Sequence, residues 1–491
     1  MLSLLALTLV STGTLIRGGT VVDGLGGLPY VADVRIEGDR IVAIAPRLSD
    51  RVGDRILLAK GLVVAPGFID AHSHADGGIE KDPLAESQLT QGITTAVVGQ
   101  DGAWSAPVAD QIAHLNSVKP AIHFALFSGH GGIRRKVLGE EYKRAATPEE
   151  IVRMQALVEA DMRAGALGLS SGLEYDPGYY SNTEELVALA KAASPFGGMY
   201  ISHVRDEADK AFEAFDELRR ISREGNLPAQ ISHIKLGSAA VWGKASRATA
   251  LLGPRLTADV YPYVFWQSTA AALTPSREWE KREIWVKSFA DVGGPQNVRL
   301  TNYTHEKTWV GKTLAEIAAT TGRDAIAIVQ EVLQKTHGEG GSGEESVAVT
   351  AMTEEDLETF VRHPRIMFSS DGQLGGTHPR GAGSFPRVLG RFVRERHVLS
   401  LQEAIRKMTS LPAQTFHLSD RGVVRVGAYA DLVVFDPATI IDHATAADPT
   451  ALSTGVRYVL VDGSLALANG KPTGVRAGGA VIRSSSLVLG P

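Results

Sequence analysis

The chain has 491 residues, of which 44% are hydrophobic and 21% charged, with 52 glycines and 22 prolines. This composition is ordinary for a globular α/β protein and excludes the disordered, fibrous and coiled-coil classes. The 50 basic and 55 acidic residues give a formal net charge of −5, so no basic block is available and we expect no nucleic-acid partner. The chain has no cysteine, which excludes disulfides and thiolate ligands and leaves His, Asp and Glu for metal chemistry.

The first ten residues are almost wholly apolar, and the first charge is Arg17. This segment is too short to span a bilayer, and no other segment reaches that length, so we expect no membrane partner. It also lacks a basic start and a small-residue cleavage site. Residues 1–13 are therefore either the remnant of an export signal or an ordinary first strand, and we expect a cytoplasmic protein with export as the alternative.

The two ends of the chain share a pattern of short β-branched strands separated by Gly and Asp turns. The first such region spans residues 14–57, and the second begins at Gly422. This pattern predicts a small antiparallel unit. We expect residues 1–62 and 416–491 to form one small β-sandwich domain beside the middle of the chain.

The middle of the chain alternates short apolar strands with helical segments. Helix starts are marked by a capping box at 147–150 and by Asn182 with Glu185, and Gly165 marks a helix end. Eight such strands alternating with helices predict a (β/α)8 TIM-like barrel over residues 63–415, although a doubly wound sheet has similar strands. Residues 276–355 form an expected insertion that can cover the barrel mouth. The predicted strands are 63–69, 93–99, 121–128, 166–171, 199–203, 229–233, 256–261 and 365–370.

The strongest chemical signal follows the first strand, where residues 66–74 read Pro-Gly-Phe-Ile-Asp-Ala-His-Ser-His. The strand period of two puts the imidazoles of His72 and His74 on one face, where they can chelate a divalent ion. Three further strands end in His203, His233 and Asp371, and in a barrel these ends meet at the C-terminal mouth. Nitrogen and oxygen donors of this kind suit Zn²⁺ or a similar ion.

The same motifs resemble a known family. Further matches are Gly-His-Gly at 129–131 and the segments 200–207, 259–263, 378–390 and 430–436. In combination they resemble the amidohydrolase superfamily and, within it, the N-acyl-D-amino-acid deacylases, or D-aminoacylases. The resemblance covers about residue 15 to about residue 471. It implies a metal-dependent enzyme that hydrolyses the linear amide bond of N-acyl-D-amino acids to a carboxylate and a free D-amino acid.

The resemblance also implies one or two divalent ions, Zn²⁺ by preference. It assigns His72 and His74 with Asp371 to one site, and His203 with His233 to a second. Family members often supply a Cys after the second strand in a Gly-Asn-Cys-Gly context, whereas this chain reads Gly-Gln-Asp-Gly at 99–102. Asp101 is either a hard oxygen ligand in that place or a turn residue, and its position at a strand end favours the ligand.

The implied mechanism uses an ion-activated water, with Asp371 taking its proton and passing it to the leaving amine. The resemblance gives Lys235 the substrate carboxylate as its partner, helped by Tyr263. Arg380 either meets a carboxylate or is a solvated loop charge. The expected partner is thus a small N-acyl amino acid, and a homo-oligomer stays open.

Two alternative functions come from different classes. A cyclic-amide hydrolase of the hydantoinase or dihydroorotase kind typically bridges its metals with a modified lysine, and residues 166–173 at the fourth strand contain no lysine. A non-catalytic scaffold of the same superfamily would require degraded ligand positions, and none is degraded. Both observations favour the deacylase.

Overall fold

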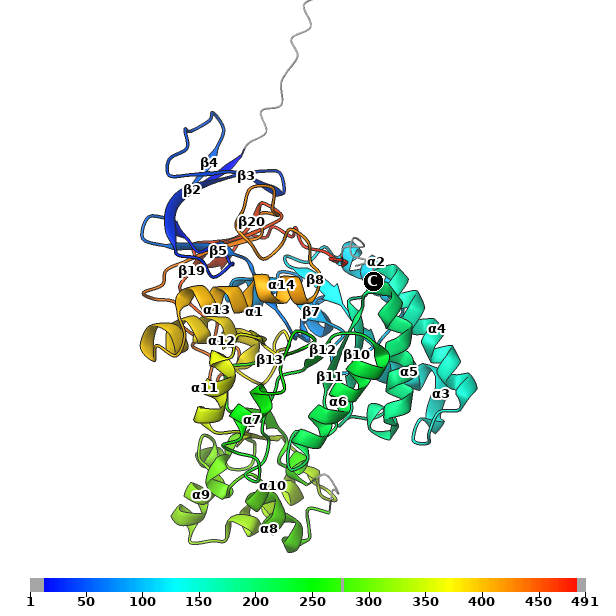
Figure 1. Cartoon of the computed structure of the whole chain (residues 1–491). Helices are drawn as coiled ribbons and strands as arrows, with labels where there is room; N and C mark the ends of the chain where they lie inside the picture. Colours follow the sequence, from blue (N-terminus) through cyan, green and yellow to red (C-terminus); the bar gives the residue numbers. More distant parts are fainter. Residues whose placement is uncertain (1–12, 275–277, 484–491) are drawn as a thin grey trace, which may run out of the picture.

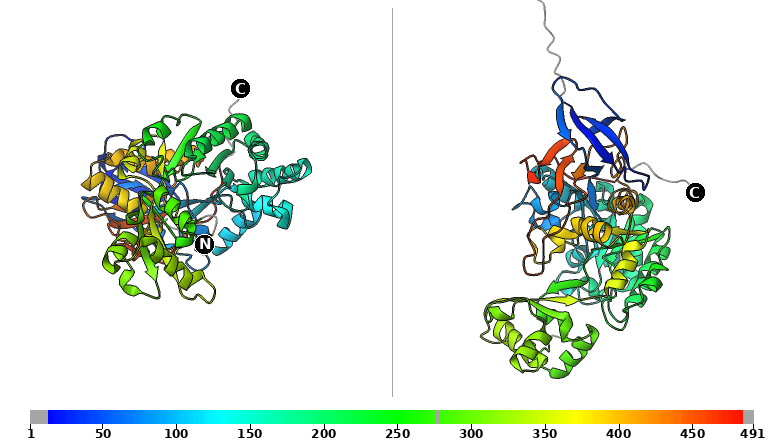
Figure 2. Two further views of the ribbon diagram at one scale, coloured as in Figure 1. Left: turned by 90° about the horizontal axis from the view of Figure 1, so that it is seen from below. Right: turned by 90° about the vertical axis from the view of Figure 1, so that its left-hand side faces the viewer.

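The computed structural model describes residues 13–274 and 278–483 (Figure 1). A β-domain built from both chain ends, a central barrel and an inserted subdomain follow one another along the molecule (Figures 1 and 2). The two interpretations of the apolar N-terminus concern residues that lie mostly outside the described part. Among the described residues, no helix combines the length and the apolar character needed to cross a bilayer.

The centre of the molecule is a closed barrel of parallel strands. The strands pair in the orders β6-β7-β8 and β9-β10-β11-β12-β13-β17, and only Phe127 separates β8 from β9, so these two share one of eight strand positions. The Ala71 N–H donates to the Phe368 carbonyl (3.4 Å) and the Asp371 N–H to the His72 carbonyl (2.8 Å), which closes β17 onto β6. The predicted (β/α)8 barrel is confirmed. Its strands are β6 (Phe68–Asp70), β7 (Ile93–Val98), β8 (His123–Leu126), β9 (Ser128–Gly129), β10 (Gly168–Gly172), β11 (Met199–His203), β12 (Ala229–Ile231), β13 (Leu256–Val260) and β17 (Ile366–Phe368).

Helices surround this barrel on the outside (Figure 1). The capping box is present at Thr147 and Glu150, the Asn182 side chain caps the helix that contains Glu185, and Gly165 ends a helix in the left-handed conformation. These three local predictions are confirmed. The helices are α1 (Glu86–Leu89), α2 (Val108–Val118), α3 (His130–Leu138), α4 (Pro148–Ala164), α5 (Thr183–Ala193), α6 (Ala211–Gly225), α7 (Ala245–Thr249), α11 (Glu354–Arg362), α12 (Arg380–Arg387), α13 (Leu401–Met408) and α14 (Ser410–Thr415).

The strand predicted at residues 63–69 is in fact two strands in two sheets. β5 (Val63–Pro66) pairs with β1 and β18 in the β-domain, whereas β6 pairs with β7 in the barrel. The break falls at Gly67, whose N–H donates to the Asp431 carbonyl (2.8 Å), and a Cβ there would lie 2.3 Å from Thr94. Hydrophobic periodicity continues across this break because both strands are buried, so the sequence pattern does not reveal it.

Within the described residues, the β-domain contains one nine-stranded sheet over its own apolar core. Its strands come from both ends of the chain, as predicted. The prediction that the unit is antiparallel is wrong in part, because β4 and β5 pair with β1 in parallel. The division at residues 62 and 416 stays a proposal, and β5 lies just past the first of these boundaries. The strands are β1 (Thr14–Val21), β2 (Tyr30–Glu37), β3 (Arg40–Ala45), β4 (Arg55–Leu58), β5 (Val63–Pro66), β18 (Leu432–Phe435), β19 (Val456–Val461), β20 (Ser464–Ala468) and β21 (Lys471–Pro472).

A separate subdomain projects from the barrel between β13 and β17 (Figure 2). It has its own apolar core around Trp285, and its antiparallel sheet takes in β14, which lies before the predicted insertion of residues 276–355. Trp266, Gln267 and Ser268 of β14 line the cavity at the barrel mouth. The elements are β14 (Phe265–Ser268), α8 (Arg282–Asp291), β15 (Val298–Tyr303), α9 (Leu314–Thr321), α10 (Ala325–His337) and β16 (Glu345–Thr350).

A largely buried charge cluster, in which only Asp462 is half-buried, joins the barrel to the β-domain. His123 Nε2 on β8 lies 3.6 Å from Asp431 Oδ1 and 3.4 Å from Asp462 Oδ2. Arg421 pairs with both carboxylates, and its contact with Asp462 Oδ1 is 3.0 Å. Burial lowers the pKa of His123, but the two carboxylates outweigh it and raise that pKa to about 9. The cluster therefore holds two cations and two anions, and the imidazolium is stabilised by folding.

This cluster predicts a specific pH dependence of stability. Because the folded pKa of His123 is about 9 and an unfolded histidine titrates near about 6.5, its contribution is complete below about pH 6.5 and disappears as the pH rises through 9. His123→Gln is expected to lower the free energy of unfolding by roughly 3 kcal/mol at pH 6, and by much less at pH 9.5. Urea unfolding of both proteins across this range checks it, and a constant difference between them would contradict the assignment.

Candidate metal centre

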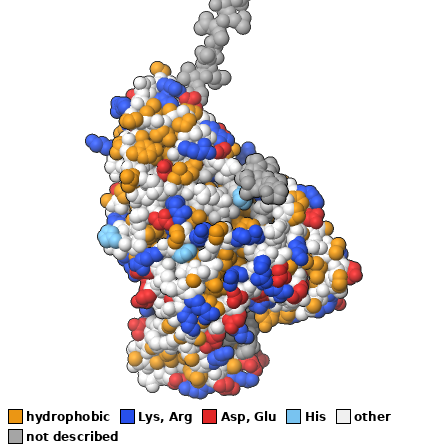
Figure 3. Space-filling model, viewed as in Figure 1, with side chains coloured by type: hydrophobic (Ala, Val, Ile, Leu, Met, Phe, Trp, Pro, Cys, Tyr) orange, Lys and Arg blue, Asp and Glu red, His pale blue; other side chains and the backbone are white. Residues whose placement is uncertain are grey.

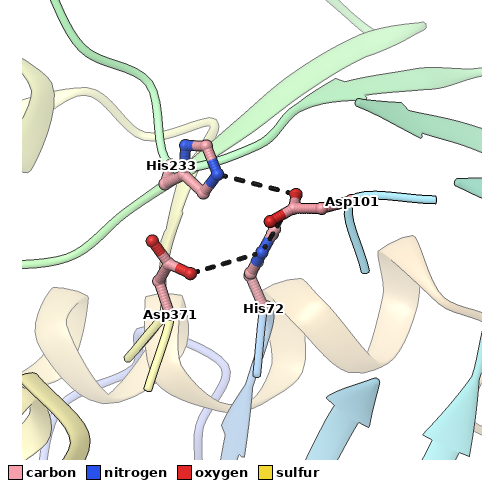
Figure 4. Close-up of side chains that lie close together, drawn as sticks. All are labelled: His72, Asp101, His233 and Asp371. Carbon is pink, nitrogen blue, oxygen red and sulfur yellow. Dashed lines mark ion pairs between the residues drawn. The ribbon is translucent and has the colours of Figure 1, made fainter. Parts of the chain in front are cut away.

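The predicted ligands meet at the carboxyl ends of the barrel strands. His72 Nε2 lies 3.5 Å from Asp101 Oδ1 and 3.6 Å from Asp371 Oδ1 (Figure 4). His74 Nε2 lies 3.3 Å from an oxygen of each of the same two carboxylates. His233 Nε2 lies 3.7 Å from Asp101 Oδ1 on the other side. Residues from four different strand ends thus surround one small volume.

These donors fit a divalent cation. One ligand atom from each of His72, Asp101, His233 and Asp371 lies within 4.8 Å of the others. Both ring nitrogens of His72 and Oδ1 of Asp101 are buried without a hydrogen-bond partner. Buried polar atoms without partners are costly, and a cation bound between His72 Nε2 and Asp101 Oδ1 would satisfy these two atoms. Neutral imidazoles and ionised carboxylates are the donors that zinc accepts.

A second group of donors adjoins the first and shares His233 with it. His203 Nδ1 lies 3.1 Å from His233 Nε2. His203, Glu207 and His233 each offer an atom within 4.8 Å of the others. The predicted division into two ligand sets is therefore not a separation in space, because His233 and Asp101 lie between them.

The backbone of the ligand loops is shaped for this arrangement. Asp101, His233 and Asp371 all have positive φ, at 54°, 33° and 48°. Non-glycine residues seldom adopt that region, and such strain persists only where the surroundings enforce it. At His233 the enforcing group is Asp259, whose Oδ1 accepts the His233 N–H (3.0 Å). At Asp101 the backbone is held by close packing against Gly172. A Cβ on Gly172 would lie only 2.4 Å from the Asp101 carbonyl oxygen.

The strand period does not place the His-x-His pair as the sequence argument supposes. β6 ends at Asp70, so His72 and His74 lie beyond the strand. They are held by pairing with the loop after β17, in which the His74 N–H donates to the Gly372 carbonyl (2.9 Å). Asp70 ties the same two segments together by accepting the Ser370 N–H (2.7 Å). Burial raises the pKa of Asp70 to about 7, although its hydrogen bonds to Ser370 lower it.

The electrostatics keep the two central carboxyls ionised. Burial raises the pKa of Asp371, but the Arg380 guanidinium and His233 outweigh it and hold that pKa well below its usual range. Burial also raises the pKa of Asp101, but the neighbouring histidines outweigh it and hold that pKa well below its usual range. In return, Asp101 and Asp371 overcome burial and raise the pKa of His74 to about 10. Ionised carboxylates are the form that binds a cation.

The centre opens into a cavity of about 700 Å³. Lys235 and Arg380 both line it, and both are already paired: Lys235 Nζ donates to Glu207 Oε2 (2.6 Å), and Arg380 to Asp371 Oδ2 (2.7 Å). The hypothesis that Arg380 is a solvated loop charge is therefore not supported, because its guanidinium pairs with Asp371. Tyr263 is not among the residues that line this cavity, and its hydroxyl donates to the Pro379 carbonyl (3.4 Å) instead.

Three residues near the centre have no role in the sequence analysis. Glu174 and Tyr175 follow β10, and Glu207 follows β11. All three line the cavity, and Tyr175 OH lies 3.2 Å from His203 Nδ1. Glu207 lies in the motif at 200–207, four residues after His203, but a carboxylate at that spacing is also common on solvated surfaces. The two residues after β10 carry no spacing signal at all.

A (β/α)8 barrel with histidines and carboxylates gathered at its C-terminal mouth defines a metal-dependent barrel enzyme. Comparison with protein families gives a match between residues 58–466 and the model described as "Amidohydrolase family". The chain belongs to this amidohydrolase family.

Several characterised relatives cover nearly the whole chain. The N-acyl-D-glutamate deacylase of Alcaligenes xylosoxydans xylosoxydans is 35% identical over 505 residues, covering 97% of each protein. A crystal structure of D-aminoacylase superposes with a TM-score of 0.81 at 32% identity, covering 96% of this chain and 99% of that one. The N-acyl-D-glutamate deacylase of Bordetella bronchiseptica, solved with zinc and a phosphonate mimic of the tetrahedral intermediate, gives 0.80 at 32% identity with the same coverage.

Proposed function

We propose that this chain is a metal-dependent deacylase that hydrolyses the amide bond of N-acyl-D-amino acids, releasing a carboxylate and the free D-amino acid. The observation that carries this proposal is the group of His72, Asp101, His233 and Asp371, whose ligand atoms lie close together and of which the last three line a cavity that also contains two cationic side chains. Relatives that act on N-acyl-D-amino acids, one of them solved with zinc, support the substrate class and the ion.

We propose that the ligand residues hold one or two divalent ions, with zinc as the first choice. Bound there, such an ion would lower the pKa of a water molecule and would polarise the substrate carbonyl. We propose Asp371 for the proton transfers, because its Oδ1 faces His72 and His74 while its Oδ2 is held by Arg380. The ionised Asp371 takes the proton from water and delivers it to the leaving amine.

We propose that Lys235 and Arg380 bind the substrate carboxylate, since both line the cavity and both are cationic. Each would then share its charge between the substrate and the carboxylate it already contacts. Tyr263 is left out of this proposal because it faces Pro379 rather than the cavity.

Lys235→Ala is expected to lower kcat/KM for N-acetyl-D-amino acids by roughly tenfold or more, since a charged hydrogen bond is lost. The matching neutral amides lack the carboxylate and are expected to lose less. Steady-state kinetics on both substrate sets check this, with the exposed Lys210→Ala as the control. Equal losses of kcat/KM on both substrate sets would show that Lys235 does not bind the substrate carboxylate. Its role would then be its contact with Glu207.

The function itself is tested by a substrate panel. Hydrolysis is measured for N-acetyl-D- and N-acetyl-L-amino acids with acidic and neutral side chains, together with a hydantoin and a dipeptide. We expect turnover of the D-forms. Ring opening of the hydantoin without turnover of the linear D-substrates would overturn the proposal in favour of a cyclic-amide hydrolase.

The compartment and the assembly complete the proposal. We propose a cytoplasmic enzyme, with export as the alternative, to be decided by cell fractionation. We also propose a homo-oligomer, supported by exposed apolar side chains that gather on the β-domain (Figure 3). Large exposed apolar patches mark interaction surfaces. Light scattering of the purified chain measures the assembly directly.

A further inference from the structure

Two carboxylates lie against the ring nitrogens of His203 and His233 that face away from the metal centre. His203 Nε2 lies 3.0 Å from Glu174 Oε2. His233 Nδ1 lies 3.0 Å from Glu207 Oε1. Each imidazole therefore has a carboxylate on one nitrogen and the cluster of candidate ligands on the other.

The inward nitrogens converge on the metal ligands. His203 Nδ1 and His233 Nε2 are 3.1 Å apart, and His233 Nε2 is also the nitrogen near Asp101 Oδ1 (3.7 Å). The two nitrogens of an imidazole lie on different edges of the ring and point in different directions. An ion that His233 binds through Nε2 would therefore lie on the far side of the ring from Glu207, although Glu207 is near enough to count among possible ligands.

We propose that Glu174 and Glu207 are positioning residues that fix the ring orientation and tautomer of the two histidines, rather than ligands of the ion. Glu174 accepts the Nε2 proton of His203 and leaves Nδ1 free to bind. Glu207 accepts the Nδ1 proton of His233 and leaves Nε2 free. Metal-ligating histidines commonly donate their second N–H to a carboxylate in this way. The inference deepens the proposed function, because it rests on the same metal centre.

The surroundings of the two carboxylates agree with these roles. Lys235 Nζ lies 2.6 Å from Glu207 Oε2 and 3.1 Å from His233 Nδ1, so in the state we propose both His233 and Lys235 donate to Glu207. The Glu207 N–H in turn donates to Glu174 Oε1 (3.2 Å), which links the two carboxylates through the backbone. His203 and His233 are thus held by one connected set of hydrogen bonds.

Metal affinity measured on the full chain tests the proposal independently of catalysis. Apo-protein is titrated with Co²⁺, and its visible absorption and dissociation constant are compared for the parent, Glu174→Ala and Glu174→Gln. We expect Glu174→Ala to weaken Co²⁺ binding by about 10- to 100-fold. Glu174→Gln is expected to lose clearly less, because the amide oxygen still accepts the Nε2 proton. Asp176→Asn, in the same loop and in contact with Tyr142 instead, is the matched control and should bind as the parent does.

The outcomes separate the possible failures. Parent-like Co²⁺ affinity in Glu174→Ala would overturn the inference and leave the proposed deacylase untouched. A loss in Glu174→Gln as large as in Glu174→Ala, with a changed absorption spectrum, would overturn it in favour of direct ligation. The two results can also differ: Glu174→Ala can bind Co²⁺ more weakly while the parent protein hydrolyses none of the N-acyl-D-amino acids. That outcome would support the inference and overturn the proposed function. Melting temperatures of the apo-proteins show whether a loss is local.

Discussion

Asp371→Asn is expected to lower turnover of N-acetyl-D-amino acids by at least about 10²-fold, the usual scale for removing a general acid or base. Asparagine has nearly the same shape, and its amide oxygen can still accept from Arg380, which contacts Asp371 Oδ2 at 2.7 Å. The fold and the ion held by His203 and His233 are therefore expected to survive. Initial rates at saturating substrate, elemental analysis for bound metal and a melting temperature measure the three quantities on one preparation.

The metal content decides how such a loss is interpreted. Full metal content with turnover reduced by two orders of magnitude identifies Asp371 as the proton carrier. Near-parent turnover at full metal content would exclude that role. Loss of both metal and turnover would make Asp371 a ligand first, and Asp371→Glu, which keeps the carboxylate, then shows whether charge alone restores binding.

Asp101→Ala is expected to weaken metal retention and turnover at least about tenfold, since even groups outside the ligand shell are commonly worth about 10- to 100-fold in metal affinity. Asp101 contacts His72, His74 and His233 at 3.5, 3.3 and 3.7 Å, so its removal leaves three imidazoles without their common anion. Titrations with Zn²⁺, Co²⁺ and Mn²⁺ together with rates at each loading check the expected loss. Unchanged affinity and turnover would return Asp101 to the status of a turn residue.

Asp101→Cys extends this prediction to the kind of ion. A thiolate is softer than a carboxylate, so this variant is expected to recover part of the zinc-dependent activity and to lose more of its Mn²⁺ binding than of its Zn²⁺ binding. Because the parent has no cysteine, it is expected to be indifferent to thiol reagents that do not chelate metal, whereas the variant is sensitive. Parallel titrations of the three proteins make the comparison.

The sequence by itself predicts the barrel and most of the candidate metal ligands at its mouth. Alternation of short apolar strands with capped helices predicts the barrel, because a buried parallel strand and an amphipathic helix each have a local pattern. The same reading places histidines and carboxylates after the strands. In a barrel all strand ends of one direction meet at one mouth, so His72, His74, His203, His233 and Asp371 are expected at the same rim, and the family resemblance adds Asp101.

Tertiary structure alone decided how the side chains pair. Local periodicity runs through Gly67, but the chain changes sheets there, and the Gly67 N–H donates to the backbone carbonyl of Asp431, far along the sequence. Lys235 faces the cavity as expected, yet its nearest partner is Glu207. Glu174 carries no motif and still lies 3.0 Å from His203. Such contacts join different strands, and their energy depends on distance and burial, which a one-dimensional pattern does not contain.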